Sequence, residues 1–99
     1  MYRSIEVRYK ISRIPGTFSG GGNDIDLALG FRNEAMYHVE AALEAKGLGE
    51  CVGAEIGRDE VNFGFEVKDF DAAEAAVRKS VAGTKFEGIR QITRFEMPA

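Results

Sequence analysis

Residues 50–67, ECVGAEIGRDEVNFGFEV, decide the fold, because two strand-like runs stand here on either side of a short polar turn. In the second run every other residue is large and apolar, which places these side chains on one face of a strand. They are Val61, Phe63, Phe65 and Val67. The pattern predicts a β-hairpin that turns at Arg58 and Asp59.

The next segment, FDAAEAAVRKSVAG, has the apolar period of a helix. Asp71 and Glu74 have the spacing of a capping box, and Phe70 stands in the position of a hydrophobic staple. Gly83 marks the expected end of the helix. The residues expected to face the core are Ala73, Ala76, Val77, Ser80 and Val81.

The amino-terminal half of the chain shows two further alternating runs. Residues 4–12, SIEVRYKIS, read as a half-buried strand, and residues 23–31, NDIDLALGF, read as a second strand. A helix is expected to begin at Asn33, a good N-cap, and to end at Gly47. Its core stripe is expected to be Ala35, Met36, Val39, Ala42, Leu43 and Lys46.

A weak internal repeat suggests the topology. NDIDLALGFRN matches DEVNFGFEVKD in character at an offset of 36 residues, and both precede predicted helices. A last strand, GIRQITRFEM, has Ile89, Ile92 and Phe95 three apart, which predicts a β-bulge or a bend. Residues 1–99 are thus expected to form a single α+β domain of order ββαββαβ with a ferredoxin-like βαββαβ core. The sheet should be mainly antiparallel, with both helices on one face and the other face open.

Composition disfavours several classes of function. The net charge is -3 with both signs mixed along the chain, so nucleic-acid binding, which draws its affinity from basic residues, is not expected. No signal segment or membrane-spanning run is recognisable. The one cysteine suits a reducing compartment, and we expect a cytoplasmic protein.

The glycine-rich stretch PGTFSGGGND, residues 15–24, raises the question of a phosphate cradle. Such cradles normally lead into a helix N-terminus, whereas a strand-like run follows here, and the lysine of a P-loop is missing. We therefore expect a connecting loop. IPGTF also resembles the Pro-Gly that ends the first strand of ACT regulatory domains, although there the helix follows at once.

The stretch LGFRNEAMYHVEAALEAKGLGECV resembles acylphosphatases, in which a Gly-Phe-Arg leads to a helix and then through a glycine turn to the next strand. The resemblance implies that Arg32 binds a phosphoryl group. The catalytic asparagine of that family has no counterpart at Gly53, Ala54 or Glu55. A phosphate-ester or acyl-phosphate hydrolase is therefore the alternative function.

Other catalytic or metal-binding groups are not indicated. His38 and Glu34 are four residues apart on one predicted helix, but two ligands are too few for a metal site. Cys51 has no histidine nearby in sequence to activate it. We predict no catalytic residue, no metal and no cofactor.

The open face of the predicted sheet is where function is expected. Small residues interrupt its charged side chains, and glycine inside a strand often marks the approach of a ligand or another backbone. The candidate binding residues are Arg8, Ala28, Gly30, Arg32, Gly53 and Gly64. We expect a homodimer formed sheet on sheet, with a protein partner or a small anionic ligand at Arg8 or Arg32 as alternatives. A further alternative is that the small residues only relieve crowding on a twisted sheet.

The stretch GAEIGRDEVNFGFEVKDFDAAEAAV resembles small bacterial proteins of α+β type that are themselves functionally uncharacterised. This resemblance implies no activity. The sequence thus favours a non-catalytic binding domain, of which an immunity-type protein that neutralises a toxin is one concrete form.

Overall fold

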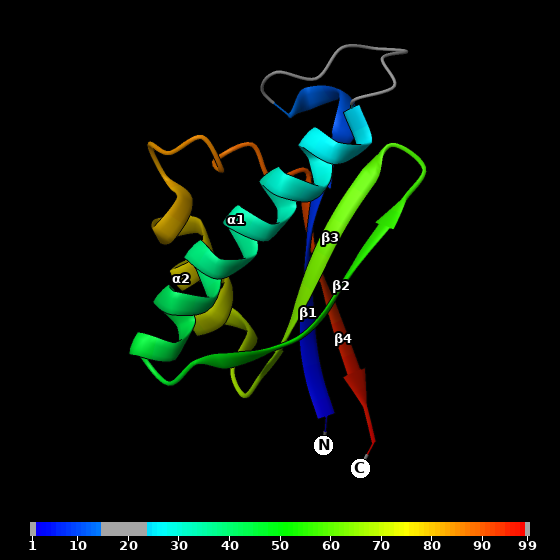
Figure 1. Ribbon diagram of the computed structural model, residues 1–99. Coiled ribbons are helices and arrows are strands. Elements are labelled where there is room, and N and C mark those ends of the chain that lie inside the picture. Colours follow the sequence, from blue (N-terminus) through cyan, green and yellow to red (C-terminus); the bar gives the residue numbers. More distant parts are fainter. Residues whose placement is uncertain (1, 15–23, 99) are drawn as a thin grey trace.

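The computed structural model describes residues 2–14 and 24–98 (Figure 1). Within them, four strands form an antiparallel sheet of order β2-β3-β1-β4, and both helices cover the same face of it. The elements are β1 (Tyr2–Lys10), a short 3-10 helix (Ile11–Arg13), α1 (Asp24–Ala45), β2 (Gly49–Gly57), β3 (Glu60–Val67), α2 (Phe70–Val81) and β4 (Gln91–Met97). The predicted α+β class, antiparallel sheet and one-sided helix layer are confirmed.

Strand β1 lies inside the sheet, between β3 and β4. Its alternation separates two surfaces, because successive side chains of a strand point to opposite faces. Ile5, Val7 and Tyr9 are buried beneath the helices. Glu6 and Arg8, which alternate with them, lie on the face without helices.

The core lies between this sheet and the two helices, and Tyr9 lies within it. The Tyr9 ring packs edge-on against Phe31 of α1, with ring centroids 5.1 Å apart. Its hydroxyl donates a 2.7 Å hydrogen bond to the carbonyl of Phe86, in the segment between α2 and β4. Tyr9 therefore joins the sheet, α1 and the α2–β4 connection in one buried contact.

The β2–β3 hairpin is as predicted, and the turn residue Asp59 has a positive φ of 54°. All four apolar residues expected on one face of β3 are buried. A register shift lies between Cys51 and Gly53 of β2, and Val52 between them is 51% exposed. The bulge predicted near Ile89 and Phe95 is wrong, since β4 pairs with β1 without interruption and Ile89 precedes the strand.

The largest correction concerns residues 24–31, predicted as a strand, which form the first turns of α1. A helical stripe explains this outcome: Ala28, Phe31 and Ala35 are all buried, at spacings of three and four residues. The order of described elements is thus βαββαβ, and ββαββαβ is wrong. The repeat at an offset of 36 residues joins a helical segment to a strand, so it has no structural counterpart.

The longer helix also bears on two other predictions, the N-cap at Asn33 and the connecting loop at residues 15–24. Asn33, predicted as an N-cap, lies inside α1 and accepts hydrogen bonds from Arg32. The connecting loop predicted for residues 15–24 falls outside the described residues except for Asp24, the first residue of α1. A helix rather than a strand follows this stretch, so the reason given above for preferring a connecting loop is wrong.

Helix α2 begins earlier than the predicted capping box. Asp69 is the N-cap, and its side chain accepts a 3.0 Å hydrogen bond from the amide of Ala72. Asp71 and Glu74, the expected box, bind Arg94 of β4 instead. Four of the five residues predicted to face the core (Ala73, Ala76, Val77 and Val81) are buried. The glycine ends are confirmed by positive φ angles of 64° at Gly47 and 75° at Gly83.

The variant Tyr9→Phe tests the buried hydroxyl. We expect a loss of about 1–3 kcal/mol in the free energy of unfolding at neutral pH, because the Phe86 carbonyl loses its partner. Burial raises the pKa of the Tyr9 phenol above its ordinary value. The folded state therefore holds this proton more tightly than the unfolded state, and stability falls as the pH rises above about 10.

Urea denaturation across this pH range measures both effects. The wild type should lose stability above about pH 10 more steeply than Tyr9→Phe. Tyr37→Phe is the matched control, because Tyr37 is 63% exposed. Equal losses in the two variants at neutral pH would contradict the role given to Tyr9.

Candidate functional site

The open face is the surface of the sheet opposite the helices. Residues directly opposite one another in antiparallel strands share a face, so the pairing register fixes its members. Around β1, Glu6 lies between Gly64 of β3 and Thr93 of β4, and Arg8 lies between Asn62 and Gln91. On β2, Glu50, Gly53 and Glu55 lie opposite Glu66, Gly64 and Asn62.

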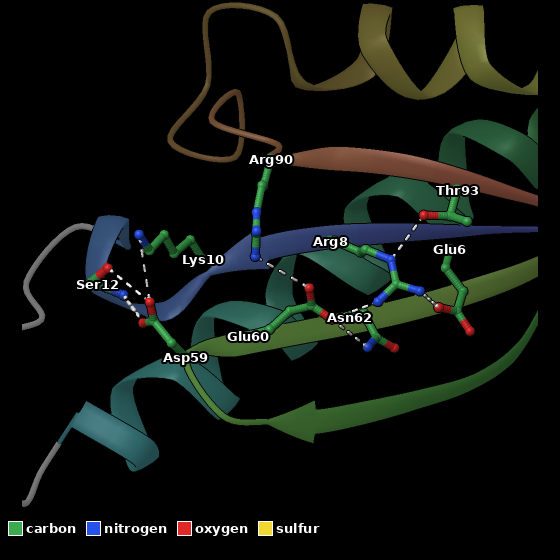
Figure 2. Close-up of polar contacts among 9 residues, drawn as sticks. All are labelled: Glu6, Arg8, Lys10, Ser12, Asp59, Glu60, Asn62, Arg90 and Thr93. Atoms are coloured by element: carbon green, nitrogen blue, oxygen red, sulfur yellow. Dashed lines mark hydrogen bonds and ion pairs between the residues drawn. The ribbon is translucent and has the colours of Figure 1, made fainter.

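Arg8 is the centre of a polar network on this face (Figure 2). Its Nε donates to Thr93 Oγ1 at 3.0 Å, its Nη1 to Glu60 Oε2 at 2.7 Å, and its Nη2 to the carboxylate of Glu6. All three guanidinium nitrogens thus have protein acceptors, and two of the acceptors are carboxylates. The charge of Arg8 is compensated within the sheet, so Arg8 should attract a small anion only weakly.

The network extends along β3 toward the hairpin turn (Figure 2). Glu60 also accepts a 3.3 Å hydrogen bond from Asn62 Nδ2 and forms an ion pair with Arg90, 3.7 Å from Nη1 to Oε1. Lys10 lies 3.8 Å from Asp59, which also accepts a hydrogen bond from the amide of Ser12. At this end of the open face, opposite charges are therefore matched.

The other part of the face carries unmatched charge. Glu50, Glu55 and Glu66 are exposed, and none of them forms an ion pair with any residue in the described part of the chain. Glu50 and Glu66 lie directly opposite each other, an arrangement that destabilises a sheet. We call these three residues the acidic patch.

A small hollow lies beside the acidic patch. Its volume is about 210 Å³, and its lining includes Gly53, Gly64, Val52, Glu55 and Asn62. The two glycines pair directly across β2 and β3. Gly53 is exposed with open space where a side chain would stand, whereas Gly64 is buried beside the side chains of Glu6 and Val52. The hollow is smaller than the usual 300–1,000 Å³ of a small-molecule site, and its size suits one inserted side chain.

A larger cleft of about 920 Å³ opens at the end of the sheet where α1 meets β2. Glu44 of α1, Cys51 of β2 and Lys68 are among the residues that line it. Glu50 and Glu66 line it as well, so the cleft borders the acidic patch.

The six residues predicted for binding separate into two groups. Arg8, Gly53 and Gly64 lie on the open face as expected. The placement of the other three on that face is wrong, because residues 24–31 are helical: Ala28, Gly30 and Arg32 all belong to α1, on the opposite side of the sheet. Ala28 is buried in the core, Gly30 is exposed on the helix surface, and Arg32 donates to the neighbouring Asn33.

Some residues of the open face escaped the sequence analysis. Strict alternation along β2 would put Glu50 on the face opposite Gly53, but the irregularity at Val52 brings both to the open face. Thr93 was missed because the expected bulge obscured the alternation of β4. Thr93, Phe95 and Met97 alternate with the charged Arg94 and Glu96, and this alternation was the signal that could have identified it.

The other candidate groups have structural partners. His38 Nε2 donates to the carbonyl of Ser80 at 2.7 Å, and Glu34 forms an ion pair with Lys85. Among the described residues there is no group of three or more His, Cys, Asp or Glu side chains arranged to hold a metal ion.

Comparison with protein-family models, with curated proteins and with solved structures gives no match for this chain. Of the helices in residues 2–14 and 24–98, neither α1 nor α2 is both long and apolar enough to cross a membrane.

The variant Glu66→Gln tests the like-charge pair of the acidic patch. We expect it to raise the free energy of unfolding by about 0.2–1 kcal/mol, because it removes the repulsion from Glu50. Glu55→Gln is the control, because Glu55 lies opposite the uncharged Asn62 and should gain less. Thermal and urea denaturation at low ionic strength measure both variants. A gain no larger for Glu66→Gln than for Glu55→Gln would contradict the repulsion.

Proposed function

We propose that this protein is a non-catalytic interaction domain whose open face binds a basic segment of a protein partner. One observation carries the proposal: the acidic patch is unpaired on a face whose other charges are matched. We further propose that the fold is a ferredoxin-like sandwich, which the order βαββαβ and the strand order β2-β3-β1-β4 support.

The charge of the open face favours a cationic partner. Five glutamates lie on it (Glu6, Glu50, Glu55, Glu60 and Glu66), whereas Arg8, Lys10 and Arg90 are the bases that the contacts above bring to it. A partner's lysine or arginine could enter the hollow at Gly53 and Gly64 and reach Glu55 at its rim. It would also relieve the repulsion between Glu50 and Glu66, which the free protein bears at a cost in stability.

The competing functions draw less support from the contacts. A small anion would need a free cation, and the guanidinium of Arg8 already has two carboxylate partners. The hydrolase alternative depends on Arg32, which is in the third turn of α1 and forms hydrogen bonds with Asn33. An immunity-type protein that covers a basic surface of a toxin remains one concrete form of the proposal, and a cytoplasmic location remains a prediction.

Electrostatics sets how such binding should behave. An exposed ion pair contributes only about 0.2–1 kcal/mol, so three carboxylates give modest affinity by themselves. They accelerate association with a basic partner and exclude acidic ones. Binding should therefore weaken steeply with added salt, since the Debye length falls from about 10 Å at 0.1 M to about 3 Å at 1 M.

An oligolysine peptide serves as the probe, with an oligoglutamate peptide as the control. In two-dimensional NMR titrations we expect oligolysine to shift the amide signals around Gly53 and Gly64, and this shift should vanish at high salt. The triple variant Glu50→Gln, Glu55→Gln, Glu66→Gln should lose most of the binding. The matched variant Asp26→Asn, Glu34→Gln, Glu87→Gln removes the same charge from residues that line neither the hollow nor the cleft, and it should retain the binding.

Two results would overturn this proposal. One is a set of shifts confined to α1 or to the cleft beside Glu44. The other is an equal loss of binding in the two triple variants, which would mean that only the net charge of the protein matters.

A further inference from the structure

Strand β4 is an exposed sheet edge with apolar side chains beside it. It pairs with β1 on one side, and no strand among the described residues pairs with its other side. Phe95 is 39% exposed and Met97 56% exposed. Both lie on the open face, since they pair with Ser4 and Tyr2 of β1. An unpaired edge with adjacent apolar surface is a template for another strand.

The two edges of the sheet differ. The β2 edge carries the irregularity at Val52 and the glycines Gly49, Gly53 and Gly57, features that twist an edge strand and weaken further pairing. Strand β4 keeps one register over all seven residues, Gln91 to Met97. It is therefore the better edge for extending the sheet.

We propose that a second copy of this chain binds this edge, β4 against β4 in antiparallel orientation, with Phe95 opposite Phe95 of the second copy. Two identical edge strands paired in this way are related by a two-fold axis perpendicular to the sheet, which makes an isologous interface. The helices of both copies then lie on the same side. The sheet becomes continuous across the dimer.

The charges on β4 select the register. Opposed residues must share a face, and a slip of one residue reverses every side chain, so Phe95 can face only residue 91, 93, 95 or 97. With Phe95 opposite Gln91, Arg94 would face the apolar Ile92. With Phe95 opposite Thr93, Arg94 would face Arg94. With Phe95 opposite Met97, Glu96 would face Glu96. Only the register with Phe95 at the axis places Arg94 opposite Glu96 of the second copy, and it does so twice.

The surrounding contacts agree with this register. Arg94 is held by Asp71 and Glu74 of α2, and Glu96 is held by Arg3. Both side chains remain almost half exposed, so each can accept a further partner of opposite charge. On the open face, the two Phe95 rings would meet, flanked by Thr93 and Met97 pairs, and would bury apolar surface that the single chain exposes.

This interface is separate from the acidic patch. The patch lies on β2 and β3, and β1 stands between β3 and β4. Two copies packed face to face, as the sequence analysis expected, would bring two net-acidic open faces together. Pairing at the β4 edge avoids that repulsion and leaves both patches accessible. An experiment can therefore disprove the dimer without disproving the binding of a basic partner, and the reverse.

Native mass spectrometry and light scattering at micromolar concentration test the dimer. The wild type should be dimeric, and Phe95→Lys should be monomeric because it sets two lysines against each other. Glu96→Lys should raise the dissociation constant roughly tenfold, since two like-charge pairs replace two opposite-charge pairs. Glu40→Lys on α1 should leave the dissociation constant of the dimer unchanged. Circular dichroism and urea denaturation establish that each variant is folded.

A disulfide tests the register directly. In a Cys51→Ser background, Phe95→Cys should cross-link into a covalent dimer under mild oxidation, because opposed Cβ atoms lie about 4.5–5.5 Å apart. Val52→Cys, exposed on β2, is the control and should not cross-link efficiently. A monomeric wild type would overturn the proposal. A dimer that persists in folded Phe95→Lys, or that cross-links at Val52→Cys as fast as at Phe95→Cys, would overturn it as well.

Discussion

The pairing of β1 between β3 and β4 is the constraint on which the other features of this fold depend. This strand is internal, so both of its edges are hydrogen-bonded and its register cannot slip without exposing its apolar side chains. Tyr9 anchors it, because its ring packs against Phe31 of α1 and its hydroxyl satisfies the carbonyl of Phe86. The same alternation directs Glu6 and Arg8 to the face without helices. One face of β1 thus contributes to the core, and its other face contributes to the open face of the sheet.

The open face divides its charges unevenly, and this division gives the protein its proposed role. Around Arg8 and Glu60 the charges are matched, so that region forms a charge-compensated surface. Glu50 and Glu66 repel each other beside a hollow where Gly53 leaves the backbone uncovered. A repulsion that the folded protein keeps, although one substitution would remove it, is the kind of stability cost found at functional surfaces.

The strands with one apolar face and the second helix were predictable from the sequence, whereas residues 24–31 were not. The segment DIDLALGF satisfies both periods, since Ile25, Leu27, Leu29 and Phe31 alternate while Ala28 and Phe31 begin a helical stripe. The helix prevails because its stripe continues to Leu43 and is buried throughout, at the price of exposing Ile25 and Leu27. Gly53 and Gly64 were found by alternation. Glu50 was not, because the irregularity at Val52 brings it to the open face. Glu60 was missed, although the alternation of β3 places it on the same face as Asn62.

Residues 24–31 belong to the helix layer, which leaves the open face to β1, β2, β3 and β4 alone. Nuclear Overhauser spectroscopy of the protein in solution tests this placement most directly. We predict contacts between the rings of Phe31 and Tyr9, together with sequential amide contacts along residues 24–45. Cross-strand α-proton contacts between residues 25–31 and a neighbouring strand would contradict the account. They would return Gly30 and Arg32 to the sheet.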